Sequence, residues 1–181
     1  MQSAELLRLA RASIEHGLAH DEPLPVDCDA LPPTLTELAA TFTTLRLDGD
    51  LRGCCGVLEA VRPLATDVAH SAFQAAFRDI RFKPVREAEL DAIRLEVSVL
   101  SAPEPITFAD QPDLLHQLVP GEDGLIIVAQ GRRATFLPKV WEQVPNPEKF
   151  VAALKMKCGL SENHWSEDLE FLRYTTATYA E

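Results

Sequence analysis

The sequence predicts an α+β fold in which a largely antiparallel sheet is flanked by helices. Two hairpin patterns, at residues 41–61 and 125–137, imply antiparallel pairing because a short turn reverses the chain between two strands. Residues 93–101 alternate apolar and polar side chains more regularly than any other segment, as expected of a strand with one buried face. Strands and helices do not alternate steadily along the chain, which argues against a doubly wound parallel sheet.

The first half of the chain is expected to form a helix, a loop, a hairpin and a second helix. Apolar residues recur at helical spacing in residues 3–18 and predict one buried stripe. Four prolines in residues 23–33 predict a loop. Pro63 suits the first turn of a helix that extends to about residue 78. The hairpin is read as a threonine-rich strand, an acidic turn and a return strand, at residues 41–47, 48–50 and 51–61.

The second half is expected to contain a strand, a short helix, a hairpin, a longer helix and a final strand. Asn146 and Pro147 are typical of the cap and first turn of the longer helix, and Gly159 is typical of its end. Cys158 falls on the apolar stripe of that helix and is predicted to be a core thiol. The expected ranges are 93–101 for the strand, 112–119 for the short helix, 125–129 and 133–137 for the hairpin, 138–143 for a helical turn, 146–159 for the longer helix and 169–178 for the final strand.

Length and composition favour a single acidic domain, or a domain with a small second lobe, that spans residues 1–181. Apolar residues make up 46% of the chain, enough for a full core. The formal net charge of -11 argues against binding to nucleic acid or to anionic lipid, both of which require a basic face. We find no secretory signal, no membrane-length apolar run and no zinc-type cysteine spacing, and we therefore expect a cytoplasmic protein with free thiols.

The densest chemistry lies in the sequence Leu-Arg-Gly-Cys-Cys-Gly at residues 51–56. In a regular strand Arg52 and Cys54 share one face, and Cys55 lies with Leu51 on the core face. A guanidinium beside a thiol favours the thiolate, so Cys54 is the candidate nucleophile or redox group. The alternative is a purely structural strand, because no general base for Cys54 is adjacent in sequence.

The glycines of this motif carry a second interpretation. Gly53 and Gly56 lack a β-carbon, so a ligand or another backbone can approach closely, or the strand can bulge. A bulge would interrupt the alternation and change the faces assigned to the cysteines. Arg52 also has a simple structural explanation, which is ion pairing with Asp48 or Asp50.

Two further groups are candidates for ligand binding. Arg78, Asp79 and Arg81 cluster at a predicted helix end and suit an anionic group, although ion pairing with acidic neighbours explains them equally well. Glu96 and Ser98 lie on the polar face of the regular strand and offer a base and a hydroxyl if that strand borders the hairpin.

His16 and His20 are four residues apart, a spacing that can place two metal ligands on one helix face. Two ligands without a third are a weak signal, and histidines at a helix C-terminus also suit the helix dipole. We therefore predict no metal site and no cofactor.

The sequence resembles the family of AmmeMemoRadiSam system protein A, also called the AMMECR domain family, over nearly its whole length. The family hallmark is Leu-Arg-Gly-Cys-Ile-Gly, which residues 51–56 match except that Cys55 replaces isoleucine. This departure fits a core-facing position for Cys55, since the family has an apolar residue there. Other matching blocks are AFRDIRF at 76–82, EVSVLS at 96–101, GLI at 124–126 and TFLPKVW at 135–141.

The resemblance implies an α+β fold with a larger and a smaller lobe, and association by gene neighbourhood with a Memo-like protein and a radical SAM protein. It implies no established activity. We favour a ligand- or partner-binding accessory module, in which Arg52 and the glycines form a pocket floor for a small molecule or a partner group. The alternative is an enzyme that uses Cys54 on a small anionic substrate. Nucleic-acid binding, suggested by the arginine clusters, is disfavoured by the net charge.

Overall fold

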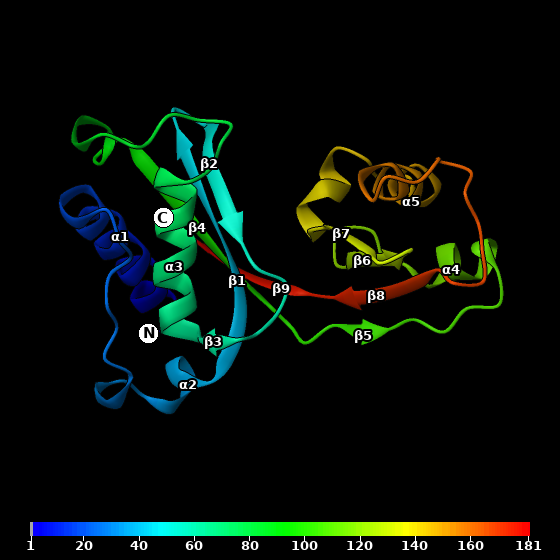
Figure 1. Ribbon diagram of the computed structural model, residues 1–181, viewed down its shortest axis with the longest axis horizontal. Coiled ribbons are helices and arrows are strands. Elements are labelled where there is room, and N and C mark those ends of the chain that lie inside the picture. The colour runs from blue at the N-terminus through cyan, green and yellow to red at the C-terminus, as the bar shows by residue number, and fades with distance from the viewer. Residues whose placement is uncertain (1) are drawn as a thin grey trace. The chain divides into compact units, whose positions relative to one another are not determined.

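The computed structural model describes residues 2–181, and the chain forms two compact units (Figure 1). Unit 1 contains the described residues up to Leu100 together with Ala177–Glu181, and unit 2 contains Ser101–Thr176. Each unit has its own antiparallel sheet and its own helices, so the predicted α+β fold with a larger and a smaller lobe is confirmed. Among residues 2–181 no helix is both long and apolar enough to cross a membrane.

The sheet of unit 1 has the strand order β2-β1-β4-β9, with a short strand β3 that pairs with β1. Strand β1 lies inside the sheet, since it pairs with β2 on one side and with β4 on the other. Several of its residues are buried. The strands are β1 (Leu38–Leu47), β2 (Asp50–Gly56), β3 (Arg62–Pro63), β4 (Ile93–Leu100) and β9 (Thr176–Ala180). Strand β2 is therefore an edge strand, and it carries the Leu-Arg-Gly-Cys-Cys-Gly motif.

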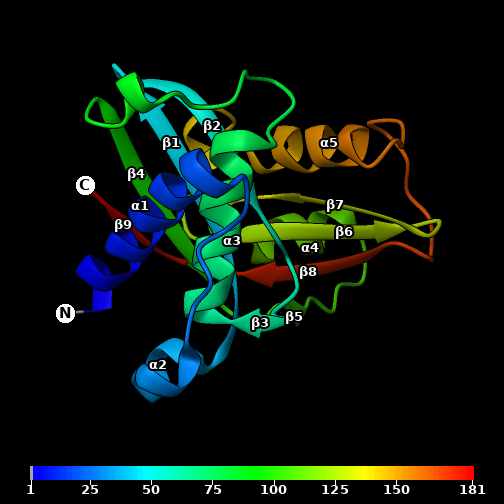
Figure 2. The same ribbon diagram turned by 60° about the vertical axis from the view of Figure 1, so that its left-hand side comes forward.

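Helices α1 (Gln2–His20) and α3 (Leu64–Phe77) pack against each other, and α3 crosses β1 and β2 (Figure 2). Ten of the 14 residues of α3 are buried, which explains its apolar composition on all but one side. A short helix α2 (Pro33–Thr36) precedes β1. The core between helices and sheet includes Leu6, Ile14, Leu45, Val68, Ala72, Leu95 and Val97.

Polar groups are also buried between α3 and β1. The Asp67 carboxylate accepts hydrogen bonds from the backbone N–H of Thr41 at 2.9 Å and from its hydroxyl at 2.7 Å. The Ser71 hydroxyl lies 3.1 Å from that of Thr41 and 2.7 Å from that of Thr43. These contacts satisfy groups that would otherwise be costly to bury, and they fix α3 on the sheet.

The sheet of unit 2 has the order β5-β8-β6-β7. Its strands are β5 (Glu104–Pro105), β6 (Gly124–Ala129), β7 (Arg132–Phe136) and β8 (Glu170–Tyr174), and its helices are α4 (Gln111–Gln117) and α5 (Pro147–Lys157). The Asn146 side chain accepts a hydrogen bond from the Lys149 amide and caps α5, as the sequence predicts. Trp141 stacks on Phe150, and the Cys158 thiol is buried in the same core, which confirms its prediction as a core residue.

Two predicted strand ranges are wrong. The segment 169–178 is not one strand, because β8 pairs with β6 in unit 2 whereas β9 belongs to the sheet of unit 1. The return strand of the first hairpin ends at Gly56 and does not extend to residue 61. Apolar residues continue past Gly56, and strand-favouring threonines continue past Tyr174, so the sequence pattern alone does not show either break.

Candidate functional site

Strand β2 contains a β-bulge at Arg52. Leu45 pairs with Gly53 and the next residue of β1, Arg46, pairs with Leu51, so Arg52 has no partner in the ladder. The expectation of regular alternation through residues 51–57 is therefore wrong. Leu51, which was predicted to lie on the core face, is 38% exposed and pairs with Arg46.

Beyond the bulge, Gly53 and Cys55 face helix α3. A β-carbon at position 53 would lie 2.1 Å from the carbonyl oxygen of Ala75 in α3, so only glycine allows this close approach. Cys55 pairs with the buried Thr43 and packs against the core of unit 1, as predicted. Burial raises the pKa of the Cys55 thiol and keeps it protonated at neutral pH.

Cys54 lies on the opposite face of the sheet. It pairs with Thr44, whose hydroxyl donates to the Cys54 sulfur at 3.5 Å, and Thr44 in turn pairs with Glu96 in β4. The structure therefore places Cys54 and Glu96 in one row across three strands, with Thr44 between them.

The next row along these strands contains two more of the candidate residues. It runs from Gly56 through Phe42 to Ser98, whose hydroxyl lies 2.9 Å from that of Thr178. A β-carbon at position 56 would lie 2.2 Å from the Thr41 carbonyl oxygen and 2.5 Å from the Phe42 ring. The volume beside Gly56 is therefore filled by the backbone of β1 and the Phe42 ring, and it is not open space.

Asp79 covers the outer edge of β2. Its carboxylate accepts the Cys54 backbone N–H at 2.9 Å and two hydrogen bonds from the Arg81 guanidinium, at 2.9 Å and 2.7 Å. The Arg81 hydrogen bonds and the Cys54 amide hold the pKa of Asp79 at about 2. Asp79 and Arg81 thus hold the segment after α3 against β2. Both are charged, and both form hydrogen bonds with the Cys54 backbone.

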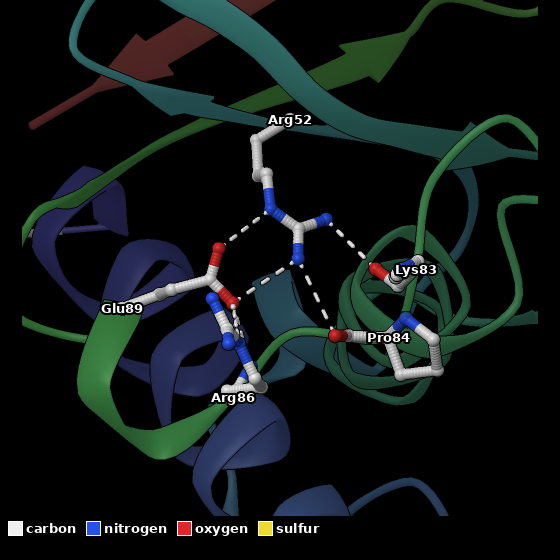
Figure 3. Close-up of polar contacts among 5 residues, drawn as sticks. All are labelled: Arg52, Lys83, Pro84, Arg86 and Glu89. Atoms are coloured by element: carbon white, nitrogen blue, oxygen red, sulfur yellow. Dashed lines mark hydrogen bonds and ion pairs between the residues drawn. The ribbon is translucent and has the colours of Figure 1, made fainter.

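The Arg52 guanidinium fastens the same segment farther along (Figure 3). It donates to both oxygens of Glu89, at 2.8 Å and 3.2 Å, and to the carbonyl oxygens of Lys83 and Pro84, at 2.9 Å and 3.3 Å. The Arg52 and Glu89 side chains are only 13% and 12% exposed. The hydrogen bonds from Arg52 hold the pKa of Glu89 at about 2, so the pair is ionised at neutral pH.

The expected partnership of Arg52 with Cys54 does not occur. Within residues 2–181 none of the Arg52 hydrogen bonds reaches Cys54, and the structural pairing with Asp48 or Asp50 does not occur either. Arg52 is a positioning residue that fixes the backbone of Lys83 and Pro84.

Arg78 does not join this group. Its guanidinium forms an ion pair with Asp21 at 2.7 Å and lies 5.0 Å from the centre of the Phe73 ring. The predicted cluster of Arg78, Asp79 and Arg81 therefore does not form one group. Of the three residues, Asp79 and Arg81 contact β2 and Arg78 does not.

A hollow of about 380 Å³ opens beside the Arg52–Glu89 pair, and we call it the basic pocket. Its lining residues are Arg52, Phe82, Lys83, Pro84 and Arg86. The Lys83 ammonium has no hydrogen-bond or ion-pair partner among the described residues, and the Arg86 side chain is 82% exposed. Sequence reasoning identified Arg52 but missed Lys83, Arg86 and Glu89, although Arg or Lys at 78, 81, 83 and 86 is a visible signal.

The two histidines considered as metal ligands stack on each other with ring centres 4.1 Å apart, and His16 lies 3.7 Å from Glu22. In the part of the chain that the structure describes, no three His, Cys, Asp or Glu side chains gather as a metal site would require.

The protein is of the α+β class, with two antiparallel sheets and an edge strand that contains two glycines. Comparisons with known proteins give its family. The AMMECR1 family model matches residues 7–179, and the chain belongs to that family. A protein of Thermofilum pendens is 34% identical over 99% of this chain and 90% of its own length. A protein of Methanothermobacter thermautotrophicus is 40% identical over 86% of this chain and 81% of its own length.

A solved structure shows the same fold. The crystal structure of an uncharacterized protein from Pyrococcus horikoshii is similar to this chain with a TM-score of 0.89. The two sequences are 32% identical, and the match covers 97% of this chain and 89% of that one. The family match and the structural match therefore agree on family and fold.

Proposed function

We propose that this protein is a ligand- or partner-binding accessory module whose recognition surface is residues 78–86 of unit 1, which we call the basic loop. The observation that carries the proposal is an accumulation of positive charge: the loop contains four of the 17 Lys and Arg residues and one acidic residue, Asp79, in a chain whose net charge is -11. Arg78 and Arg81 form ion pairs with Asp21 and Asp79, whereas Lys83 and Arg86 are exposed. Such a local field attracts acidic partners although the whole protein is acidic.

The basic loop is held in place along its length. Asp79 binds the Cys54 amide, the Val85 amide donates to the Ala76 carbonyl at 2.9 Å, and Arg52 binds two carbonyl oxygens of the loop. A loop fixed in advance loses little conformational entropy when a partner binds, which favours affinity.

The loop also exposes an apolar side chain. Ile80 is 99% exposed, between the charged residues Asp79 and Arg81. A fully exposed isoleucine on a fixed loop is suited to enter an apolar depression on a partner, while the surrounding cations contact acidic groups.

The partners that we propose are a Memo-like protein and a radical SAM protein, acting with this one in the cytoplasm. The support is the family, together with a surface suited to an acidic partner. Catalysis by Cys54 has less support, because the guanidinium that was expected to activate it is bound to Glu89.

The test is co-purification of the tagged chain with a Memo-like protein and with a radical SAM protein of the same organism. We expect binding by the wild type, and a loss of about tenfold or more in affinity for Ile80→Asp and for Lys83→Glu. Neither side chain has a partner in the described structure, so neither change should disturb folding.

The matched controls are Met156→Asp, at a 54% exposed apolar residue of unit 2, and Lys149→Glu, at an exposed lysine of α5. Both should bind as the wild type does. Failure of the wild type to bind either protein, or equal losses in the controls, would contradict the proposal. Salt-sensitive binding of single-stranded RNA at physiological ionic strength would replace it with nucleic-acid recognition.

A further inference from the structure

We propose that the basic pocket binds a phosphate monoester that carries an aromatic or aliphatic body. Lys83 and Arg86 would hold the phosphate group, and Phe82 and Pro84 would contact the body. The inference deepens the proposed function and rests on it for the view that the basic loop is a recognition surface.

The size and lining of the basic pocket suit a small organic anion. Its volume of about 380 Å³ falls within the range of small-molecule sites. Phe82 is half-buried and Pro84 is exposed, so the pocket offers a ring face and an apolar edge beside three cationic residues. A bare inorganic ion would leave those apolar walls unused.

The charge around the pocket matches a dianion. Three cations, Arg52, Lys83 and Arg86, surround one anion, Glu89, and the hydrogen bonds from Arg52 keep that carboxylate ionised. The sum leaves about two positive charges, which compares with about -1.5 to -2 for a phosphate monoester at neutral pH. A carboxylate ligand would neutralise only about half of this charge.

Free donors are present on the side chains that face the opening. The Lys83 ammonium has three N–H donors and no partner among the described residues. Arg86 uses its Nε atom toward Glu89, at 3.5 Å, and its two terminal nitrogens are left to form the forked contact that phosphate oxygens accept.

Arg52 prepares the pocket without gripping the ligand. Its hydrogen bonds to the Lys83 and Pro84 carbonyls fix the backbone from which the Lys83 side chain and the Pro84 ring extend (Figure 3). We therefore treat Arg52 as a positioning residue, and the variants that test the pocket leave it intact.

The experiment is calorimetric titration of the full chain, at physiological ionic strength, with phenyl phosphate, inorganic phosphate and benzoate. We expect phenyl phosphate to bind about tenfold more tightly than either of the others, because it supplies both the dianion and the ring. Lys83→Ala and Arg86→Ala should each weaken its binding about tenfold.

Two variants serve as matched controls. Arg8 is exposed and pairs with a glutamate three residues away, as Arg86 does, and Lys149 is an exposed lysine in unit 2. Arg8→Ala and Lys149→Ala should leave binding unchanged. A phosphotyrosine peptide distinguishes the two sources of the same chemistry: binding tighter than that of phenyl phosphate indicates a phosphorylated partner, and weaker binding indicates a free metabolite.

Three results would overturn the inference: no binding of phenyl phosphate, equal binding of benzoate, or equal losses in the control variants. The Ile80→Asp variant separates this inference from the proposed function, because Ile80 does not line the pocket. In Ile80→Asp we expect phenyl phosphate to bind as it does to the wild type, although partner binding is weakened. If the wild type itself binds neither partner while phenyl phosphate still binds, the partner proposal is wrong and the pocket stands. If partners bind and phenyl phosphate does not, the reverse holds.

Discussion

Unit 1 fixes its surface with charged side chains, whereas unit 2 fixes its interior with aromatic rings. In unit 1, Arg52, Glu89, Asp79 and Arg81 tie the basic loop to an edge strand. In unit 2, by contrast, the interior is held by stacked and edge-on rings of Phe108, Phe136, Trp141, Phe150 and Phe171.

The hollows of the two units differ in the same way. The basic pocket is cationic, whereas a hollow of unit 2 is lined by Phe108 and Trp165 together with Glu167 and neighbouring residues. Ionic fastening, together with the buried Val85, lets the basic loop keep cations and one isoleucine in solvent. This difference favours unit 1 as the location of the proposed recognition surface.

The largest effect is expected at Gly53 of unit 1, and Gly124 provides the comparison in unit 2. Gly53→Ala places a β-carbon against the Ala75 backbone and should destabilise unit 1 by about 4 kcal/mol or more. Gly124→Ala meets the Tyr174 ring at 2.4 Å and should cost unit 2 about 2 kcal/mol, since a side chain yields more readily than a helix backbone.

Both effects can be measured unit by unit. The two tryptophans lie in unit 2, so urea unfolding followed by tryptophan fluorescence reports that unit, and amide hydrogen exchange reports unit 1. Equal costs for the two glycine variants would show that the α3 backbone moves as easily as the ring.

The second effect is loss of the ionic fastening. Arg52→Ala leaves Glu89 nearly buried without its main partner and should destabilise unit 1 by about 3 kcal/mol. Amide exchange should accelerate in residues 79–89 and stay unchanged in unit 2. The control is Arg86→Ala, which removes an 82% exposed partner of the same carboxylate and should cost less than about 1 kcal/mol. Similar exchange in the two variants would argue against Arg52 as the positioning residue.

The units should respond to opposite extremes of pH. Asp79 and Glu89 have pKa values of about 2, below their ordinary 3.8 and 4.5, so unit 1 should lose about 2 kcal/mol as the pH falls from about 4.5 to 2. Burial raises the pKa of Tyr174 from 10.0 to about 12, so unit 2 should lose stability as the pH rises through that window.

The pH comparison can be checked with the same two probes. Asp79→Asn and Glu89→Gln should flatten the acid response in amide exchange, and Tyr174→Phe should flatten the alkaline response in tryptophan fluorescence. An acid response of unit 1 that survives both carboxylate changes would show that other groups carry it.

The smallest effect concerns the two adjacent thiols. Cys54 should be alkylated faster than Cys55, whose thiol packs in the core and has a raised pKa. Because the Arg52 guanidinium binds Glu89, Arg52→Lys should change the Cys54 rate by less than about twofold. Peptide mapping after brief iodoacetamide treatment measures both rates. A several-fold loss in Arg52→Lys would revive the hypothesis of a thiol activated by Arg52.

Much of the fold could be predicted because its signals are local. The regular alternation of β4 and the caps of α5 are encoded within each segment, and the structure has both elements close to the expected bounds. The division of segment 169–178 between two sheets was not predictable, because each half is a good strand and only tertiary pairing assigns it.

The position of the candidate site in the sequence could be predicted, but the contacts of its side chains could not. Cys55 was placed correctly, since an apolar position in the family motif indicates a core face. The bulge at Arg52 and the close approach of the adjacent Gly53 to Ala75 are tertiary features that no periodicity shows. The partner of Arg52 is 37 residues away, so charge sequence alone could not choose Glu89 over Asp48 or Asp50.

The fastening of the basic loop also affects how copies of this protein coexist in a crowded cell. A bare edge strand offers unpaired backbone groups to any strand of another molecule and is a starting point for aggregation. Here Asp79 accepts the Cys54 amide and Arg81 reaches the Cys54 carbonyl at 3.4 Å, so the outer edge of β2 is closed to such pairing at Cys54. The side chains that protect this edge, Asp79 and Arg81, therefore lie in the same short loop as Ile80, Lys83 and Arg86, the side chains proposed for recognition.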